Sequence, residues 1–97
     1  MEKYLVEFIG TFVLLLSIVL SHGSPLVIGG TLALCVLMGG KLSGAHFNPA
    51  VSTALMLNSK MRMNDFVPYV VAQLAGATLA VMLSRPIKKS LRTIVRL

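Results

Sequence analysis

The stretch between residues 43 and 58 constrains this chain most, because it combines a strong helix start with a very short helix. Asn48 has the side chain of a helix N-cap, and Pro49 suits the first helical position, whose N–H has no partner within the helix. From Ala50 the residues are mostly apolar until Asn58, apart from Ser52 and Thr53, which gives about eight to ten helical residues, too few for a bilayer core of about 30 Å. A short capped helix entered through small residues predicts a re-entrant half-helix. Such irregular backbone is stable at membrane depth only where it is buried in protein or lines a water-filled cavity.

The composition indicates a membrane protein with a single domain. Hydrophobic residues make up 56% of the 97 residues and charged residues only 12%, whereas a soluble domain has about 25% charged residues. The net charge of +6 does not indicate a nucleic-acid partner, because the Lys and Arg residues flank apolar segments, as they do in membrane proteins. The single cysteine, Cys35, lies inside an apolar segment, and we expect it to be a small core residue.

Three apolar segments are long enough to cross a bilayer. We expect helix one at residues 3–21, helix two at 25–42 and helix three at 65–84, with the re-entrant loop and half-helix at 43–58. The first segment could be a cleaved signal peptide, but it contains Glu7 and no small-residue cleavage site follows it. We therefore expect it to remain as a transmembrane helix, which places the two ends of the chain on opposite sides of the membrane.

The tail at residues 85–97 combines basic residues with apolar residues that fall on the opposite side of a helix. This pattern predicts either a basic amphipathic helix on an anionic lipid surface or a frayed, solvated tail. The basic residues are Arg85, Lys88, Lys89, Arg92 and Arg96.

Three motifs of the chain together point to one family. Residues 43–51 have the sequence Ser-Gly-Ala-His-Phe-Asn-Pro-Ala-Val, residues 7–12 have Glu-Phe-Ile-Gly-Thr-Phe, and residues 69–77 have Tyr-Val-Val-Ala-Gln-Leu-Ala-Gly-Ala. These resemble the Asn-Pro-Ala motif, first helix and third helix in the first half of the aquaporins and aquaglyceroporins, the major intrinsic protein family. The resemblance covers about residues 3–84 and implies half of that fold, an all-α membrane protein with three transmembrane helices and one half-helix. The second half, with its own Asn-Pro-Ala motif, is missing.

The resemblance implies a pore built from two such halves, of which one copy of this chain supplies one. We expect an antiparallel homodimer in which two copies insert in opposite orientations, and a tetramer of such dimers is the further assembly that the resemblance implies. The basic residues fit this arrangement, because they are nearly balanced between the two sides of the spans and favour neither orientation. The alternative is a partner chain that supplies the other half. The basic residues on the amino-terminal side are Lys3, Lys41, Lys60 and Arg62.

The resemblance places Asn48, Pro49 and Ala50 at the centre of the pore. A helix N-terminus carries roughly half a positive charge, so two half-helices that meet there would disfavour cations and hydronium. If the Asn48 side-chain oxygen caps its helix, the amide N–H groups remain free to donate to a passing oxygen. The alternative is that Asn48 acts as a cap only.

The loop before the half-helix is expected to line the pore. Ser43, Gly44, Ala45 and His46 would form an extended segment whose carbonyl groups accept hydrogen bonds from solute. An ionisable group at bilayer depth is costly unless it is paired, so the Glu7 carboxylate needs partners. We expect it to anchor the loop by pairing with the N–H groups of the loop or with the His46 ring. The alternative for Glu7 is a position at the membrane interface. For His46 we expect a brace of the loop rather than a proton shuttle or a metal ligand.

The distances from the motif assign the constriction to Ile28, Val36 and Val51, with Val51 at the position where the family's second half has an Arg. This ring is apolar and has no fixed cation. It predicts passage of water or of small neutral solutes such as glycerol, urea or ammonia, although Val51 would be equally suitable as a lipid-facing or core residue. We expect no cofactor, no metal and no catalysis, because the Ser, Thr and His residues form no nucleophile–base arrangement.

Two other functions fit the sequence. One is a non-conducting subunit that joins a separate complementary half or a full-length channel, and the other is a small holin-like or toxin-like protein that disrupts membranes through its basic tail. In each case we expect a multi-pass integral protein of the cell membrane, in contact with the lipid bilayer.

Overall fold

The computed structural model describes residues 1–96, which form four α-helices and no strand. Three of these helices are long and apolar enough to cross a membrane. The predicted all-α fold with three spans and one short helix is therefore confirmed. Leu97, the last residue of the predicted tail, lies outside the described residues. The helices are α1 (Glu2–Leu20), α2 (Pro25–Ser43), α3 (Pro49–Leu57) and α4 (Met63–Arg96).

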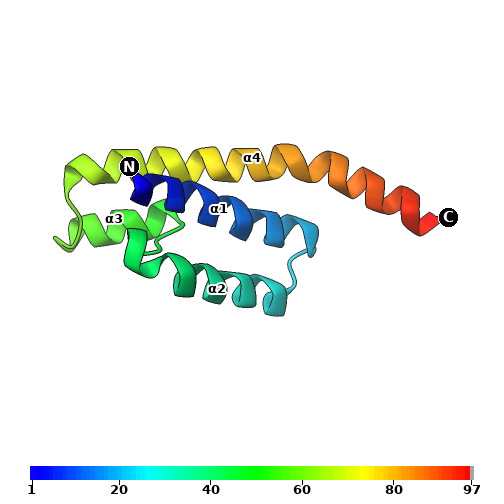
Figure 1. Cartoon of the computed structure of the whole chain (residues 1–97), viewed down its shortest axis with the longest axis horizontal. Helices are drawn as coiled ribbons and strands as arrows, with labels where there is room; N and C mark the ends of the chain where they lie inside the picture. Colours follow the sequence, from blue (N-terminus) through cyan, green and yellow to red (C-terminus); the bar gives the residue numbers. More distant parts are fainter. Residues whose placement is uncertain (97) are drawn as a thin grey trace.

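The helices are arranged around α1 and α4, which lie side by side and run in the same direction (Figure 1). α2 packs on α1 and runs in the opposite direction, and α3 packs on α4. The N-terminal end of α3 points toward the middle of the molecule, and its C-terminal end lies at the end where α4 begins. The C-terminal part of α4 extends alone beyond the turn that joins α1 to α2.

Local sequence signals explain where α2 begins and ends. Ser24 caps its start by accepting a hydrogen bond from the Val27 N–H at 3.4 Å, and Pro25 follows as the first helical residue. Gly44 ends the helix in a left-handed conformation, with φ of 88°, which glycine adopts at little cost. The chain is thereby turned back into the loop that leads to α3.

Small residues allow α1 and α4 to pack closely. A Cβ on Gly76 would lie 2.5 Å from the Phe8 carbonyl oxygen, and Ala80, one turn further along, is completely buried. This close approach is typical of helix pairs in membranes, where small residues let the two backbones meet. At the start of both helices, Asp65 accepts a hydrogen bond from the Tyr4 hydroxyl at 2.8 Å and forms an ion pair with Lys3 at 2.9 Å.

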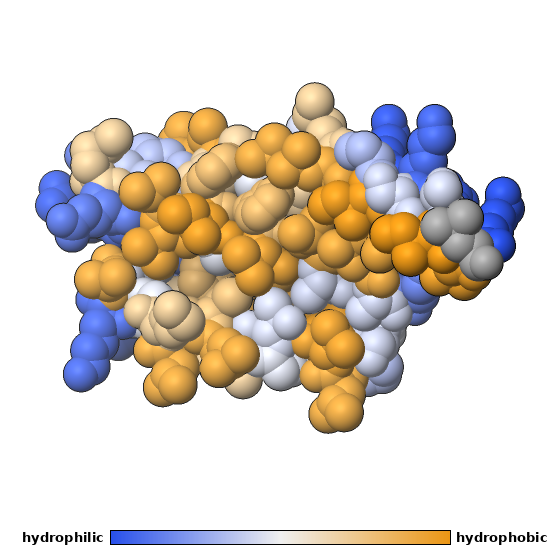
Figure 2. All heavy atoms as spheres, turned by 45° about the vertical axis from the view of Figure 1, so that its right-hand side comes forward, coloured by the Kyte–Doolittle hydropathy of each residue, from blue (hydrophilic) through white to orange (hydrophobic). Residues whose placement is uncertain are grey.

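The distribution of side chains is inverted relative to that of a soluble protein. Many large apolar side chains are exposed, and they cover most of the middle of the face shown in Figure 2, with hydrophilic side chains at both ends. The interior is mainly polar instead. This distribution suits a molecule whose middle is surrounded by lipid, where burial of apolar side chains does not drive folding. The largest fully buried side chains are Phe47, Gln73, Glu7, Thr11, Ser52 and Ser84.

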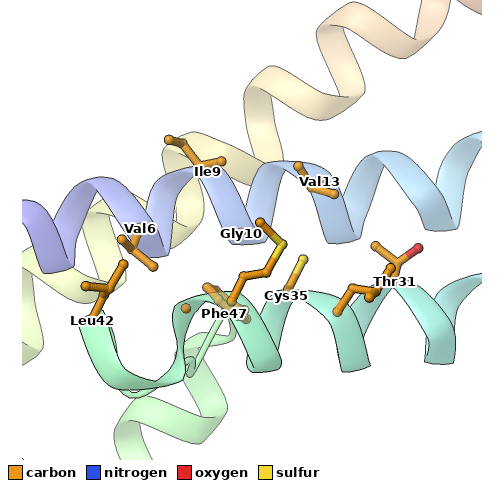
Figure 3. Close-up of a pocket in the computed structure, with 11 residues that line it drawn as sticks. Val6, Ile9, Gly10, Val13, Thr31, Cys35, Leu42 and Phe47 are labelled. Atoms are coloured by element: carbon orange, nitrogen blue, oxygen red, sulfur yellow. The ribbon is translucent and has the colours of Figure 1, made fainter.

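Phe47 is the main apolar side chain of the interior and separates α1 from α2. A Cβ on Gly10 would lie 2.0 Å from Phe47 Cε1, and a Cβ on Gly39 would lie 3.2 Å from Phe47 Cζ, so the ring fills the space that two glycines leave. Next to the ring, a hollow of about 490 Å³ lies between the two helices (Figure 3). Its other walls include Val6, Val13 and further apolar side chains. The Phe47 ring therefore fixes the separation of α1 and α2.

α4 is longer than the sequence predicts. The prediction separates a span at 65–84 from a basic tail, but the helix begins at Met63 and continues through Pro86 to Arg96. A proline inside a helix removes one backbone hydrogen bond and costs about 3 kcal/mol. The residues after Pro86 compensate in part, because Lys, Arg and Leu are frequent there and are good helix formers. The tail is thus a continuation of α4 over the described residues.

The close contact of Phe47 predicts that Gly10→Ala destabilises the protein by about 1–3 kcal/mol, since the added methyl group overlaps the ring. Thermal unfolding in detergent, followed by circular dichroism, measures this effect. Gly29→Ala is the matched control, because Gly29 is also helical but its Cβ would meet no atom within 4 Å. The control is expected to keep or slightly raise the unfolding temperature, because Ala has a higher helix propensity than Gly. Equal unfolding temperatures for the two variants would show that the ring does not fill this space.

Candidate functional site

The short helix α3 begins with the cap that the sequence predicts. Asn48 is the N-cap, with φ of −162° and ψ of 127°, and its Oδ1 accepts a hydrogen bond from the Ala50 N–H at 2.7 Å. Pro49 occupies the first helical position, and the helix has 9 residues, so it is about 14 Å long. The predicted N-cap and half-length helix are both confirmed.

The capped end of α3 faces outward from the protein interior. Asn48 and Ala50 are exposed, and Pro49 is half-buried. Because Oδ1 is used in the cap, the amide Nδ2 remains available, and within residues 1–96 it donates to no protein acceptor. The end of the helix therefore offers two side-chain N–H donors next to the positive end of the helix dipole.

Glu7 holds the loop before α3 in place. Its carboxylate is fully buried and accepts four hydrogen bonds. Oε1 accepts from the Phe47 N–H at 2.8 Å and from Gln73 Nε2 at 2.9 Å, while Oε2 accepts from the His46 N–H at 3.0 Å and from the Ser43 hydroxyl at 2.7 Å. All the acceptor sites of the carboxylate are thereby used. This one side chain connects α1, the end of α2, the loop and α4.

These contacts determine the direction of the loop carbonyl groups. The N–H groups of His46 and Phe47 point at Glu7, and the Ala45 N–H points at Ser43 Oγ at 3.1 Å. In a trans peptide the carbonyl points opposite to the N–H of the same peptide unit. The carbonyl oxygens of Gly44, Ala45 and His46 therefore point away from these internal partners. The loop combines an inner row of donors with an outer row of acceptors.

The loop differs from the predicted extended segment at two points. Ser43 is the last residue of α2, it is buried, and its carbonyl accepts a hydrogen bond from the Tyr69 hydroxyl at 2.6 Å. Its carbonyl is therefore occupied and unavailable to solute. The backbone of Ala45 and Phe47 also has positive φ, 54° at each residue, which costs on the order of 1 kcal/mol or more per residue. The hydrogen bonds to Glu7 offset this strain.

The His46 backbone N–H binds Glu7, whereas the His46 ring is braced by Ser52. Its Nδ1 lies 2.8 Å from Ser52 Oγ, and the same oxygen accepts from Gln73 Nε2 at 2.9 Å. The amide of Gln73 is oriented by Glu7, which can only accept, so Gln73 Nε2 donates to both Glu7 and the Ser52 oxygen that contacts His46. The ring also stacks at a tilt on Tyr69, with centroids 5.0 Å apart. The brace therefore links the loop to the first turn of α3.

Four residues of this site are absent from the sequence prediction: Phe47, Ser52, Tyr69 and Gln73. Two of them carry a usable signal, because Tyr69 and Gln73 are four residues apart in an otherwise apolar span and so lie on one helix face. Residues 1–96 contain no cluster of three His, Cys, Asp or Glu side chains that could hold a metal ion.

The three constriction candidates are not brought together within one chain. Ile28 and Val36 belong to α2, which packs on α1, whereas Val51 is in the first turns of α3, which packs on α4. Val36 and Val51 are 44% and 40% exposed, and Ile28 is half-buried. These residues could form a ring only with the help of a further chain or segment.

The four hydrogen bonds predict that Glu7→Gln destabilises the protein by about 3 kcal/mol or more, because the new NH₂ group must face two donors whichever way it turns. Hydrogen exchange at the amides of His46 and Phe47 should accelerate along with the loss of stability. Glu2→Gln, which changes an exposed carboxylate of the same helix, is the control and should have little effect. Unchanged exchange at both amides in Glu7→Gln would contradict the anchoring role.

Comparison with known proteins gives one family. A family profile described as Major intrinsic protein matches residues 1–95. The chain is 40% identical over 88 residues to "Glycerol uptake facilitator protein-like 6" of Lactiplantibacillus plantarum, a match that covers 82% of this chain and 41% of the relative. It is 35% identical over 97 residues to "Aquaporin NIP3-1" of Arabidopsis thaliana, a match that covers 87% of this chain and 30% of the relative. It is also 35% identical over 94 residues to "Aquaporin Z" of Bradyrhizobium diazoefficiens, a match that covers 82% of this chain and 39% of the relative.

No solved structure matches the chain. The matches span between 30% and 41% of the length of these three curated relatives. The family and the three long apolar helices identify a multi-pass integral membrane protein. The resemblance drawn from the Asn-Pro-Ala loop and the two helix motifs is confirmed, and the chain belongs to the major intrinsic protein family.

Proposed function

We propose that two copies of this chain, inserted in opposite orientations, form a membrane channel for water or small neutral solutes. The observation that carries the proposal is the exposed, Asn48-capped end of α3, held by the buried Glu7 carboxylate and directed toward the middle of the molecule. A helix end with free donors at this depth requires polar surroundings, since lipid cannot satisfy them. A water-filled path supplies those surroundings.

The channel would need two copies because each copy contributes one half-helix, α3. The matched segments are less than half the length of the relatives, so a second copy supplies a comparable amount of chain. α2 packs along α1 and meets α4 only at its end, where Ser43 accepts from Tyr69, so its exposed surface leaves room for a neighbour. The balance of basic residues between the two sides lets both orientations occur.

In such a dimer the two α3 ends would face one another at the bilayer centre. Each end carries roughly half a positive charge, so cations and hydronium are disfavoured there. The free amide groups of the two Asn48 side chains would donate to the oxygen of a passing molecule. The outward carbonyl groups of Gly44, Ala45 and His46 would accept its hydrogen bonds along the approach.

The proposed constriction is apolar. Val36 and Val51 of one copy and Ile28 of the other would form it, with no cation at the Val51 position. The side chains of such a ring offer no hydrogen bonds that would select water strictly. The ring therefore favours the passage of small neutral solutes of the glycerol, urea or ammonia class. The name of one relative, a glycerol uptake facilitator protein-like 6, includes a solute of this class, and two others are named aquaporins.

Stopped-flow measurements on liposomes that contain only this protein test the channel. Wild type should conduct water or glycerol well above empty vesicles, and Asn48→Ser should reduce this flux several-fold. Ser keeps a capping oxygen, so the unfolding temperature should stay nearly unchanged while the amide donors are lost. Val51→Arg should reduce glycerol flux by placing a long cation in the constriction. Asn64→Ser, at an exposed residue outside the loop and α3, is the control.

The other outcomes of this measurement identify the rival functions. No flux above empty vesicles would reject the channel and favour a non-conducting subunit. A leak that is indifferent to Asn48 but lost on removal of the basic residues of the tail would favour a membrane-disrupting protein.

The antiparallel arrangement predicts that both orientations occur in cells. A protease-cleavable tag at the N-terminus should be cut in roughly half of the molecules in sealed inside-out vesicles and in roughly half of those in right-side-out vesicles. Full cleavage in only one vesicle type would show a fixed orientation. The second half-helix would then have to come from a different chain or segment, even if the flux measurement succeeds.

A further inference from the structure

The C-terminal part of α4 forms a hollow that the proposed channel does not use. α4 has 34 residues and is therefore about 51 Å long, whereas a bilayer core is about 30 Å thick. Its last turns extend past the end of α1 at Leu20 (Figure 1), so they lie at or beyond the membrane surface. A hollow of about 400 Å³ is present between these turns and the segment that joins α1 to α2.

Much of the lining of the hollow is basic. Lys88, Arg92 and Arg96 follow at intervals of four residues, which places them on one face of α4, and His22 lines the hollow from the opposite segment. The three acidic residues of the sequence are at positions 2, 7 and 65, toward the other end of α1 and α4. Within residues 1–96, no side-chain carboxylate therefore neutralises the positive charge of the hollow.

The rest of the lining is apolar and lies next to the basic residues. Leu20 lines it at the end of α1, and Leu91 and Val95, which are 50% and 84% exposed, line it from α4. Apolar side chains next to uncompensated cations at the level of the membrane surface suit a ligand with a charged head and a hydrocarbon tail. A simple anion would use only half of this lining.

We propose that this hollow binds the phosphate headgroup of an anionic phospholipid. The guanidinium groups of Arg92 and Arg96 offer paired N–H donors to phosphate oxygens, and Lys88 adds a point charge. The first part of the acyl chains would lie against Leu20 and Leu91. The sequence predicts a tail that either lies on the lipid surface or is frayed, whereas the hollow lies between the end of the continuous α4 and the segment that joins α1 to α2.

Native mass spectrometry of the detergent-solubilised chain tests this site. The protein is mixed with equal amounts of phosphatidylglycerol and phosphatidylcholine that carry the same acyl chains. One double variant, Lys88→Gln with Arg92→Gln, removes two charges from the hollow. The matched control, Arg85→Gln with Lys89→Gln, removes two charges from the same helix at positions that do not line it. Glutamine keeps the helix propensity, which circular dichroism checks.

Wild type should retain phosphatidylglycerol in preference to phosphatidylcholine. Each cation near a lipid headgroup contributes about fivefold to affinity, so the variant of the hollow should bind phosphatidylglycerol about 25-fold more weakly. The control should lose less than fivefold, and inorganic phosphate at the same concentration should not displace the lipid. Equal losses in the two variants, or no preference between the lipids, would overturn the proposal. Displacement by inorganic phosphate would overturn it in favour of a site for free anions.

Discussion

The buried Glu7 carboxylate is the interaction on which the rest of the structure depends. It accepts from two loop N–H groups, from the hydroxyl at the end of α2 and from an amide on α4, so four segments are held by one side chain. A carboxylate inside a membrane protein is tolerated only when it is fully paired. Its complete pairing allows Ala45 and Phe47 to keep left-handed backbone, which in turn directs the loop carbonyl groups outward.

Polar contacts and small residues replace the hydrophobic core of a soluble domain. Gly76 lets α1 and α4 meet closely, and Gly10 and Gly39 make room for the Phe47 ring. Gln73 and Ser52 extend the Glu7 network to the first turn of α3 and to the His46 ring. The loop and the half-helix are therefore fixed on both sides. This rigidity keeps the exposed Asn48 end of α3 in one position relative to α1 and α4.

Much of the fold could be predicted because the decisive signals are local. The Asn48 cap and Pro49 specify the start of α3, and the length of the apolar runs specifies the spans. The need of Glu7 for partners also follows from burial alone, and loop N–H groups are indeed among those partners. The roles of Gln73 and Tyr69 could not be predicted, since they depend on which face of α4 meets α1. The sequence predicts a separate tail after Pro86, as a helix or as a frayed segment, and it does not predict one continuous α4, because helix formers after Pro86 offset the lost backbone bond only in part.

The position of Gln73 has a consequence for the order of assembly. Its amide donates to a carboxylate that precedes it by 66 residues, and it also donates to Ser52 Oγ, which lies 2.8 Å from His46 Nδ1. During synthesis α1, α2 and the loop therefore enter the membrane before their last internal partner exists. The two hydrogen bonds from Gln73, to Glu7 and to Ser52, are among the last of the loop network whose partners are synthesised. We therefore expect the complete network around the half-helix to form only after synthesis has reached the first half of α4.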